Sequence, residues 1–261
     1  MKLQVLMSVM NATDHNIVKN ANIRTDAIII NQCDEFKYEE FKYESNEIKF
    51  ISMAEKGVGL SRNNALMRSS GCILLFVDED ETLVDDYERL ILSEFINNPK
   101  ADMIMFNVPS SNKYNPTYEI KKSHRIHRYN SLRYGATKIA VKSNSIKQAN
   151  VYFSLLFGGG AKYSSGEDSI FVYDCLRKGL RLHTSTKIIG KVSQKKSTWF
   201  NGYDDKYFQD KGIFFWCLSP KFAYVYILQF ALMGRGYRSS RSTMKALRMM
   251  LRGVSIYRNE K

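Results

Sequence analysis

The chain has 261 residues, of which 44% are hydrophobic, so it is long enough for one large α/β domain or two small ones with a packed core. Lys and Arg outnumber Asp and Glu by 39 to 26, and the net charge of +13 favours polyanions, anionic membranes or phosphorylated ligands as partners. The four cysteines lie far apart without metal-ligand spacing, which argues against a zinc site or a disulfide framework and favours the reducing cytoplasm.

Apolar runs of strand length alternate with helix-like stretches along the first hundred residues. Strands are expected at residues 3–10, 26–30, 48–52, 72–77 and 102–108. The first run lacks a small-residue cleavage site, so it predicts a strand and not a signal peptide. Helices are expected at residues 14–22, 61–68 and 84–97, the second with Ser61 as its cap. This alternation predicts a mainly parallel sheet, covered on both faces, that binds ligands beyond the carboxyl ends of its strands.

The fourth expected strand runs directly into six carboxylates in "LLFVDEDETLVDDY", residues 74–87. Alternate residues of an extended segment share a face, so Asp78 and Asp80 can point toward one spot. Hard cations such as Mg²⁺ and Mn²⁺ take oxygen ligands, and Mg²⁺ sites commonly combine one or two carboxylates with substrate phosphates. We expect Asp78 and Asp80 to serve such a site, and Asp85 and Asp86 to stabilise the start of the next helix.

Two other segments carry polar residues at the start of an expected helix. In "EKGVGLSRNNAL", residues 55–66, two glycines precede a helix that exposes Arg62 and Asn63. In "FGGGAKYSSGEDSIF", residues 157–171, three glycines precede Glu167 and Asp168. Each segment also has an ordinary explanation, as a turn or as favourable charge at a helix N-terminus.

The order of "GLSRNNAL", "FVDED" and "GEDSIF" resembles the inverting nucleotide-sugar glycosyltransferases of family 2, over roughly residues 3–190. The resemblance extends to bacterial enzymes that build surface polysaccharides. It implies a GT-A fold, which is an α/β architecture with a Rossmann-like, mainly parallel sheet flanked by helices. We expect this transferase domain to span residues 1–212 and a basic, aromatic, helical extension to span 213–261.

The resemblance also implies roles for individual residues. Asp78 would contact the nucleotide ribose or help to hold the metal, and Asp80 would coordinate Mn²⁺ or Mg²⁺. Asp168 would be the general base. Asp34 and Arg62 would lie at the nucleotide, for which UDP is the expected donor form.

Glu167, the first residue of the acidic pair, is expected on the donor side of the site. The family often supplies a metal-binding histidine near residues 187–202, but this stretch contains none. Gln194 or water would then complete the metal site. Lys195 and Lys196 either contact phosphate or are ordinary surface lysines. The first strand also ends in "SVMNATD", without the proline-containing turn of the family.

Two segments are expected to lie on the surface. The tandem "EFKYEEFKYES", residues 35–45, fits a surface loop or a hairpin. Residues 109–135 form an irregular insertion with six Lys or Arg against one Glu, which is either a solvated loop or a mobile basic lid near a phosphate.

The C-terminal part of the chain is basic and apolar. The run at 222–233 is too short for a routine transmembrane helix. Residues 219–261 contain nine Lys or Arg and one Glu, which supply +8 of the net charge. Met244, Leu247, Met250 and Leu251 recur at helical spacing, so this helix either lies on an anionic membrane or packs into the core with its arginines solvated.

The expected function is metal-dependent transfer of a sugar from a nucleoside diphosphate to a hydroxyl of a glycan or lipid-linked acceptor in bacterial surface polysaccharide synthesis. The enzyme would work in the cytoplasm, either free or on the inner face of the plasma membrane. A nucleotidyltransferase, which would release pyrophosphate, is one alternative. A nonenzymatic basic protein that binds membrane or RNA is another, although no nucleic-acid-binding motif accompanies the basic tail.

Overall fold

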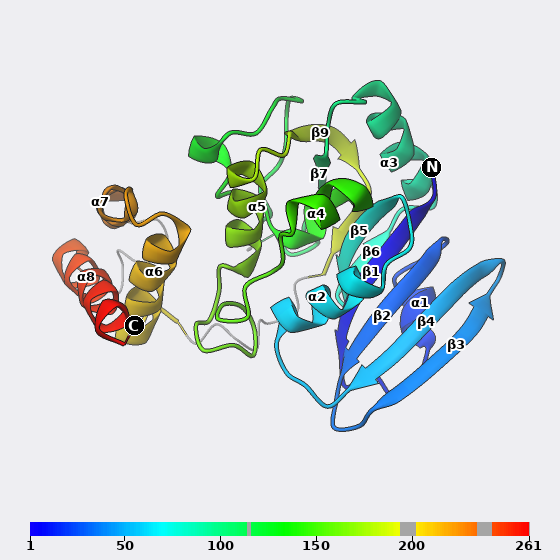
Figure 1. The fold of residues 1–261 in the computed structure, drawn as a ribbon, viewed down its shortest axis with the longest axis horizontal. Coiled ribbons are helices and arrows are strands. Elements are labelled where there is room, and N and C mark those ends of the chain that lie inside the picture. The colour runs from blue at the N-terminus through cyan, green and yellow to red at the C-terminus, as the bar shows by residue number, and fades with distance from the viewer. Residues whose placement is uncertain (114–115, 194–201, 234–241, 261) are drawn as a thin grey trace. The chain divides into compact units, whose positions relative to one another are not determined.

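A computed structural model describes residues 1–113, 116–193, 202–233 and 242–260 (Figure 1). The chain divides into two compact units. The first contains residues 1–155 and 167–196, and the second contains residues 156–166 and 197–261. The boundary expected after residue 212 falls inside helix α6 (Asp205–Leu218). Gln194, Lys195 and Lys196, considered above for the metal and the phosphate, lie outside the described residues.

The first unit is built on an eight-stranded sheet with the order β3-β4-β2-β1-β5-β8-β7-β9. Its strands are β1 (Leu3–Met10), β2 (Asp26–Gln32), β3 (Lys37–Tyr43), β4 (Asn46–Met53), β5 (Ile73–Asp78), β7 (Met103–Asn107), β8 (Ile139–Lys142) and β9 (Leu182–Ile188). Strands β4, β2, β1 and β5 are parallel neighbours, and β9 is parallel to β7. The expectation of a mainly parallel sheet flanked by helices is therefore confirmed.

All five expected strands form. The FKYE tandem becomes β3, which pairs antiparallel with β4 as a hairpin. Strand β8 was not predicted, because four residues are too few to show a periodic pattern, and it inserts antiparallel between β5 and β7. A separate two-stranded sheet joins β6 (Glu81–Leu83) to β10 (Gly190–Val192).

Helices cover both faces of the large sheet (Figure 1). One face packs against α1 (Asn16–Asn20) and α3 (Tyr87–Asn97), and the other against α2 (Val58–Arg68), α4 (Ser143–Ala149) and α5 (Glu167–Arg177). Strand β1 shows why, because Val5 and Met7 point to the first face and Leu6 to the second. Both core clusters are almost free of solvent, so the carboxyl ends of the strands are held rigidly.

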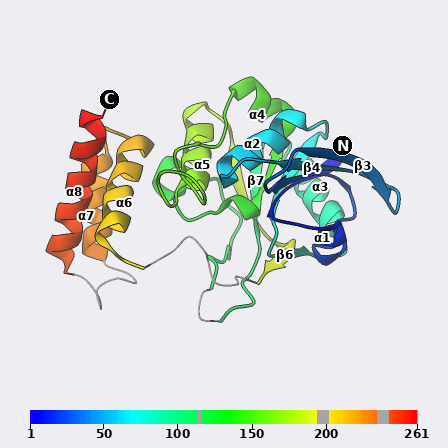
Figure 2. The same ribbon diagram turned by 90° about the horizontal axis from the view of Figure 1, so that it is seen from below.

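The second unit is a group of three helices, α6, α7 (Ala223–Met233) and α8 (Thr243–Asn259) (Figure 2). Helices α6 and α8 approach closely because each carries a glycine at the contact. A β-carbon on Gly212 would lie 2.1 Å from the Met250 carbonyl oxygen, and one on Gly253 would lie 2.2 Å from that of Gln209. Within the described residues, no helix has the length and hydrophobicity that crossing a bilayer requires.

Candidate active site

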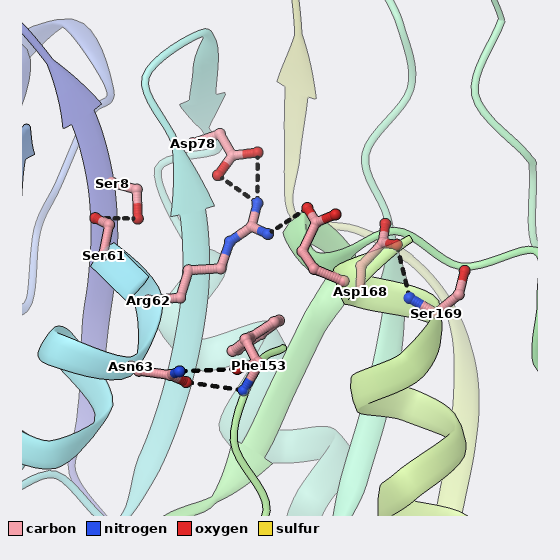
Figure 3. Close-up of polar contacts among 9 residues, drawn as sticks. Ser8, Ser61, Arg62, Asn63, Asp78, Phe153, Asp168 and Ser169 are labelled. Atoms are coloured by element: carbon pink, nitrogen blue, oxygen red, sulfur yellow. Dashed lines mark hydrogen bonds and ion pairs between the residues drawn. The ribbon is translucent and has the colours of Figure 1, made fainter. Parts of the chain in front are cut away.

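Arg62 joins two acidic segments that are far apart in the sequence (Figure 3). Its Nη2 atom donates to both carboxylate oxygens of Asp78, at 2.9 and 3.0 Å. Its Nη1 atom donates to Oε1 of Glu167 at 3.1 Å. Burial alone would lower the pKa of the guanidinium, but the charges of Asp78 and Glu167 outweigh burial and raise it, so Arg62 is always a cation.

The sequence of α2 explains how Arg62 is placed. Ser61 Oγ donates to Ser8 Oγ at 2.9 Å, which ties the helix to β1. Asn63 exchanges two hydrogen bonds with the backbone of Phe153, at 2.8 and 2.9 Å. A β-carbon at Gly59 would lie 2.5 Å from the carbonyl oxygen of Ser154, so only glycine permits this approach. The "GLSRNN" segment therefore fixes α2 against two separate parts of the unit.

Two expectations about α2 need correction. Ser61 is not the cap, because the helix begins three residues earlier at Val58 and Ser61 hydrogen-bonds to the sheet instead. Arg62 is not displayed on the surface, since only 4% of it is exposed. The polar side chains of this segment are used mainly for internal contacts, which a helical pattern alone does not reveal.

The acidic pair opens helix α5, as the sequence predicted. Glu167 faces Arg62, and the charge of Asp168 acts on the same guanidinium. Asp168 Oδ1 also accepts a hydrogen bond from the backbone N–H of Ser169 at 2.6 Å (Figure 3). This contact orients the Asp168 carboxylate at the N-terminus of the helix, where negative charge is stabilised.

The turn after β5 holds the other carboxylates. Asp78 ends the strand, and the backbone of Asp80 accepts from the N–H of Ser193 at 2.9 Å. Glu79 Oε2 accepts from the N–H of Met10 at 2.8 Å, which links the turn to the end of β1. The side chain of Asp80 is half-buried. The carboxyl ends of β1 and β5 therefore meet at this turn.

Glu81 was not singled out from the sequence, yet it is the most unusual side chain of the turn. It is 2% exposed, and among the described residues neither carboxylate oxygen has a partner in good hydrogen-bond geometry, although the nearby Thr137 side chain offsets part of the effect of burial on its pKa. Burial, with the nearby charge of Asp78, raises the pKa of Glu81 well above its ordinary value. Burial lowers the pKa of the Lys138 ammonium to about 8, although the charge of Glu81 acts to raise it. A buried carboxylate without a partner is costly unless a ligand satisfies it.

The residues of this turn fit a divalent cation. No group of three or more His, Cys, Asp or Glu side chains among the described residues is arranged to hold a metal ion by itself. A site for Mg²⁺ or Mn²⁺ does not need such a group, because substrate phosphates supply further oxygens. Asp80 and the unsatisfied oxygens of Glu81 are ligands of the right kind, whereas both oxygens of Asp78 already accept from Arg62.

The end of β2, where Asp34 lies, is less distinctive. Asp34 follows β2 and is exposed. Its neighbour Asn31 is buried, and it exchanges hydrogen bonds with the backbone of Ala12 at 2.9 and 3.0 Å. This pair holds the turn after β1 in which Asn11 adopts a positive φ of 52°. The role of Asp34 at the nucleotide stays a prediction. Asn31 was not singled out from the sequence, because a polar residue inside an apolar strand gives no sign of its partner.

The fold of the chain resembles those of several glycosyltransferases. TarS from S. aureus, residues 1–349 with UDP-GlcNAc, superposes with a TM-score of 0.62 and 16% identity, over 87% of this chain and 67% of that one. The same fragment with UDP superposes with a TM-score of 0.65 and 14% identity, over 97% of this chain and 81% of that one. The mannosyltransferase PcManGT from Pyrobaculum calidifontis, with GDP-Man and Mn²⁺, superposes with a TM-score of 0.54 and 10% identity. The superposition covers 100% of this chain and 76% of that one.

These likenesses establish the GT-A-like fold. The chain spans 40% of the length of a longer TarS chain that it also matches, with a TM-score of 0.58. No protein-family model and no curated relative matches the sequence. The α/β architecture with its mostly parallel sheet is therefore that of glycosyltransferases of the GT-A type.

Proposed function

We propose that this chain is a metal-dependent inverting glycosyltransferase that takes a sugar from a nucleoside diphosphate donor. The observation that carries the proposal is the Arg62 bridge, because it brings the carboxylate that ends β5 beside the acidic pair that opens α5. A transfer of this kind uses one carboxylate as the base for the acceptor hydroxyl and others to hold a cation at the leaving diphosphate. The UDP-GlcNAc, UDP and GDP-Man complexes of the similar structures support a nucleotide-sugar donor.

Asp168 serves as the general base in this proposal. It accepts the proton of the acceptor hydroxyl as that oxygen bonds to the anomeric carbon, while the bond from this carbon to the diphosphate oxygen breaks. The nucleoside diphosphate leaves from the opposite face, so a single displacement inverts the anomeric configuration. The hydrogen bond from Ser169 N–H orients Asp168 for this task.

Asp80 and Glu81 would hold the divalent cation, Mn²⁺ or Mg²⁺. The cation stabilises negative charge on the leaving diphosphate by several kcal/mol when it is bound. Arg62 holds Asp78 and Glu167 in place and offsets part of their charge, since two carboxylates accept from one guanidinium. The Asp78 side chain is partly exposed, so it remains available to the ribose of the donor. Asp34 follows β2, which ends on the same side of the sheet as β5.

The finer features of the reaction follow the resemblance to family 2. We expect UDP as the nucleotide and a hydroxyl of a glycan or lipid-linked molecule as the acceptor, in the assembly of a bacterial surface polysaccharide. Two of the similar structures contain UDP or UDP-GlcNAc, which supports the choice of nucleotide.

A thermal-shift experiment with UDP, UDP-GlcNAc and GDP-Man, each with and without Mn²⁺, tests the proposal. A ligand that binds only the folded protein raises its melting temperature, and we expect the largest rise for a UDP species with Mn²⁺. Asp80→Asn should remove the metal-dependent part of the rise. Asp86→Asn, which removes a carboxylate from the same acidic run, is the matched control and should leave it intact. Release of pyrophosphate from UTP in place of UDP from the sugar nucleotide would favour a nucleotidyltransferase.

We also propose that the second unit binds an anionic membrane through α7. The outer face of this helix is apolar, with Leu228 50% and Leu232 58% exposed, and it lines an open groove of about 480 Å³. Helix α7 contains no charged residue, whereas α8 exposes Lys245, Arg248 and Arg252. An apolar face within a basic unit is suited to the interface of an anionic bilayer.

The expectation for α8 is only partly met. Met250 is fully buried at the contact with Gly212 of α6, while Met244 is 65% exposed. Leu251 is also exposed and Leu247 is half-buried, so only part of the apolar series of α8 is buried in the unit. Exposed apolar side chains lie on α7 and, to a smaller extent, on α8.

A further inference from the structure

The insertion after β7 is firmly attached to the sheet. Asn107 exchanges two hydrogen bonds with the backbone of Ile120, at 2.8 and 3.0 Å. Ile126 N–H donates to the carbonyl oxygen of Leu182 at 2.8 Å, and Thr184 N–H donates to that of His124 at 2.9 Å. Residues 120–126 are therefore an irregular, mostly exposed segment that is attached at these points to β7 and to the edge strand β9.

This anchored segment exposes a series of cations, which we call the basic strip. Its members are Lys121, Lys122, Arg125, Arg128 and Arg133, all of which are exposed. None of them forms an ion pair with a described residue, whereas Lys2, Arg24 and Lys37 elsewhere in the unit do. Burial, with a smaller contribution from the charges of Arg125 and His124, lowers the pKa of neighbouring His183.

Aromatic rings accompany the cations. Tyr129 is 82% exposed, and His127 stacks on it with ring centroids 5.5 Å apart and an interplanar angle of 5°. The guanidinium of Arg133 lies over Tyr118, at 5.3 Å from its centroid. Exposed rings between cations provide flat apolar area for a chain molecule whose charges the cations bind.

The basic strip leads to the proposed general base. Its last cation, Arg133, is followed two residues later by Gly135, where a β-carbon would lie 3.4 Å from Asp168 Oδ2. The backbone at this end of the strip is therefore in van der Waals reach of the carboxylate that would activate the acceptor. A molecule that lies along the strip can place a hydroxyl near Asp168.

We propose that the acceptor is an anionic glycan, whose phosphate or carboxylate groups bind the basic strip while one hydroxyl reaches Asp168. This inference rests on the proposed function, because it assigns the acceptor of that reaction. Arg guanidinium groups bind phosphate and carboxylate in paired hydrogen bonds, and unpaired surface cations gain most from such a partner. The spacing along a chain segment favours a polymer over a single small anion.

Binding of fluorescently labelled, phosphorylated dextran to the full chain tests the proposal, with unmodified dextran of the same length for comparison. We expect binding only of the phosphorylated polymer, with affinity that falls as salt is raised. The variant K121Q/R125Q/R128Q should bind it about tenfold more weakly, as expected for three exposed charge pairs. The control K19Q/K42Q/K100Q removes the same charge from exposed lysines elsewhere in the unit and should bind normally.

Equal losses in the two variants would show that net charge alone attracts the polymer, and this result would overturn the proposal. So would binding of single-stranded RNA that depends on the strip when phosphorylated dextran does not bind. The thermal shift with UDP-GlcNAc and Mn²⁺ separates the two hypotheses. If the strip variant keeps this thermal shift, its donor site is intact and its loss of polymer binding concerns the acceptor hypothesis alone. If the unmodified protein shows no such shift, the proposed function itself is contradicted.

Discussion

Arg62 Nη1 and Glu167 Oε1 lie 3.1 Å apart, although 105 residues separate them in the chain. The same guanidinium holds Asp78, so the strand end and the helix start are positioned by one buried cation. Removing a charged member of such a buried group leaves the others uncompensated, which costs more than the pair itself contributes. The bridge is therefore a structural requirement of the site before any donor binds.

Replacing Arg62 with methionine is expected to lower the free energy of unfolding by about 3 kcal/mol, because Asp78 and Glu167 lose their shared cation. Urea denaturation followed by circular dichroism measures this change. Arg68→Met, on the exposed side of the same helix, is the matched control and should stay within about 0.5 kcal/mol. Equal stability of the Arg62→Met and unmodified proteins would show that the bridge does not support the fold.

Asp168→Asn should reduce sugar transfer by about a hundredfold or more, because the amide cannot accept the acceptor proton. Donor binding should persist, since the substitution leaves Arg62, Asp78 and Asp80 in place. Steady-state release of UDP and the thermal shift with UDP-GlcNAc measure the two properties. Asp174→Asn, on the same helix, should retain activity. Full activity in Asp168→Asn would exclude this residue as the base.

Glu81 should make stability depend on pH in the metal-free protein. Burial raises its pKa in the folded state, so above pH 4.5 the folded state binds more protons than the unfolded state. The free energy of unfolding should therefore fall as pH rises from 4.5 through the raised folded-state pKa. Glu81→Gln should flatten this decline and stabilise the protein by about 1 kcal/mol at its alkaline end.

Urea denaturation in EDTA at a series of pH values measures the effect, with Glu35→Gln at an exposed carboxyl as the control. The same Glu81→Gln protein should lose the Mn²⁺-dependent thermal shift with UDP, since it lacks a metal ligand. A variant that is more stable but still shows the full shift would rule out Glu81 as a ligand. Glu81 is therefore expected to lower the stability of the metal-free protein while it contributes to metal binding.

Leu228→Ser with Leu232→Ser should reduce sedimentation of the protein with vesicles that contain anionic lipid, because the substitutions remove the apolar face of α7. Both side chains are exposed, so folding should be unaffected. The control pair Met67→Ser with Ile96→Ser removes exposed apolar side chains from the first unit. Undiminished sedimentation of the α7 variant would locate membrane contact elsewhere.

Much of the fold was predictable from the sequence, because apolar runs and their spacing depend on local chemistry. The strand before Asp78 and the acidic start of α5 follow from such patterns. The partners of Arg62 could not be predicted in this way, because a helical pattern shows which residues share a face of the helix but not which residues lie opposite that face. Glu81 was missed for a related reason, because it looks like one more solvated carboxylate until the pairing of β6 with β10 buries it.

Strand β3 lies at one end of the large sheet, with only β4 as its neighbour. Its sequence "KYEEFKY" places charged residues along the whole strand. Open strand edges tend to recruit other chains into intermolecular sheets, and charged side chains discourage this pairing. We expect the charges of the FKYE tandem to discourage such pairing at this edge. Replacing the lysines and glutamates of β3 with threonine or valine is expected to allow this edge strand to pair with other chains and cause aggregation.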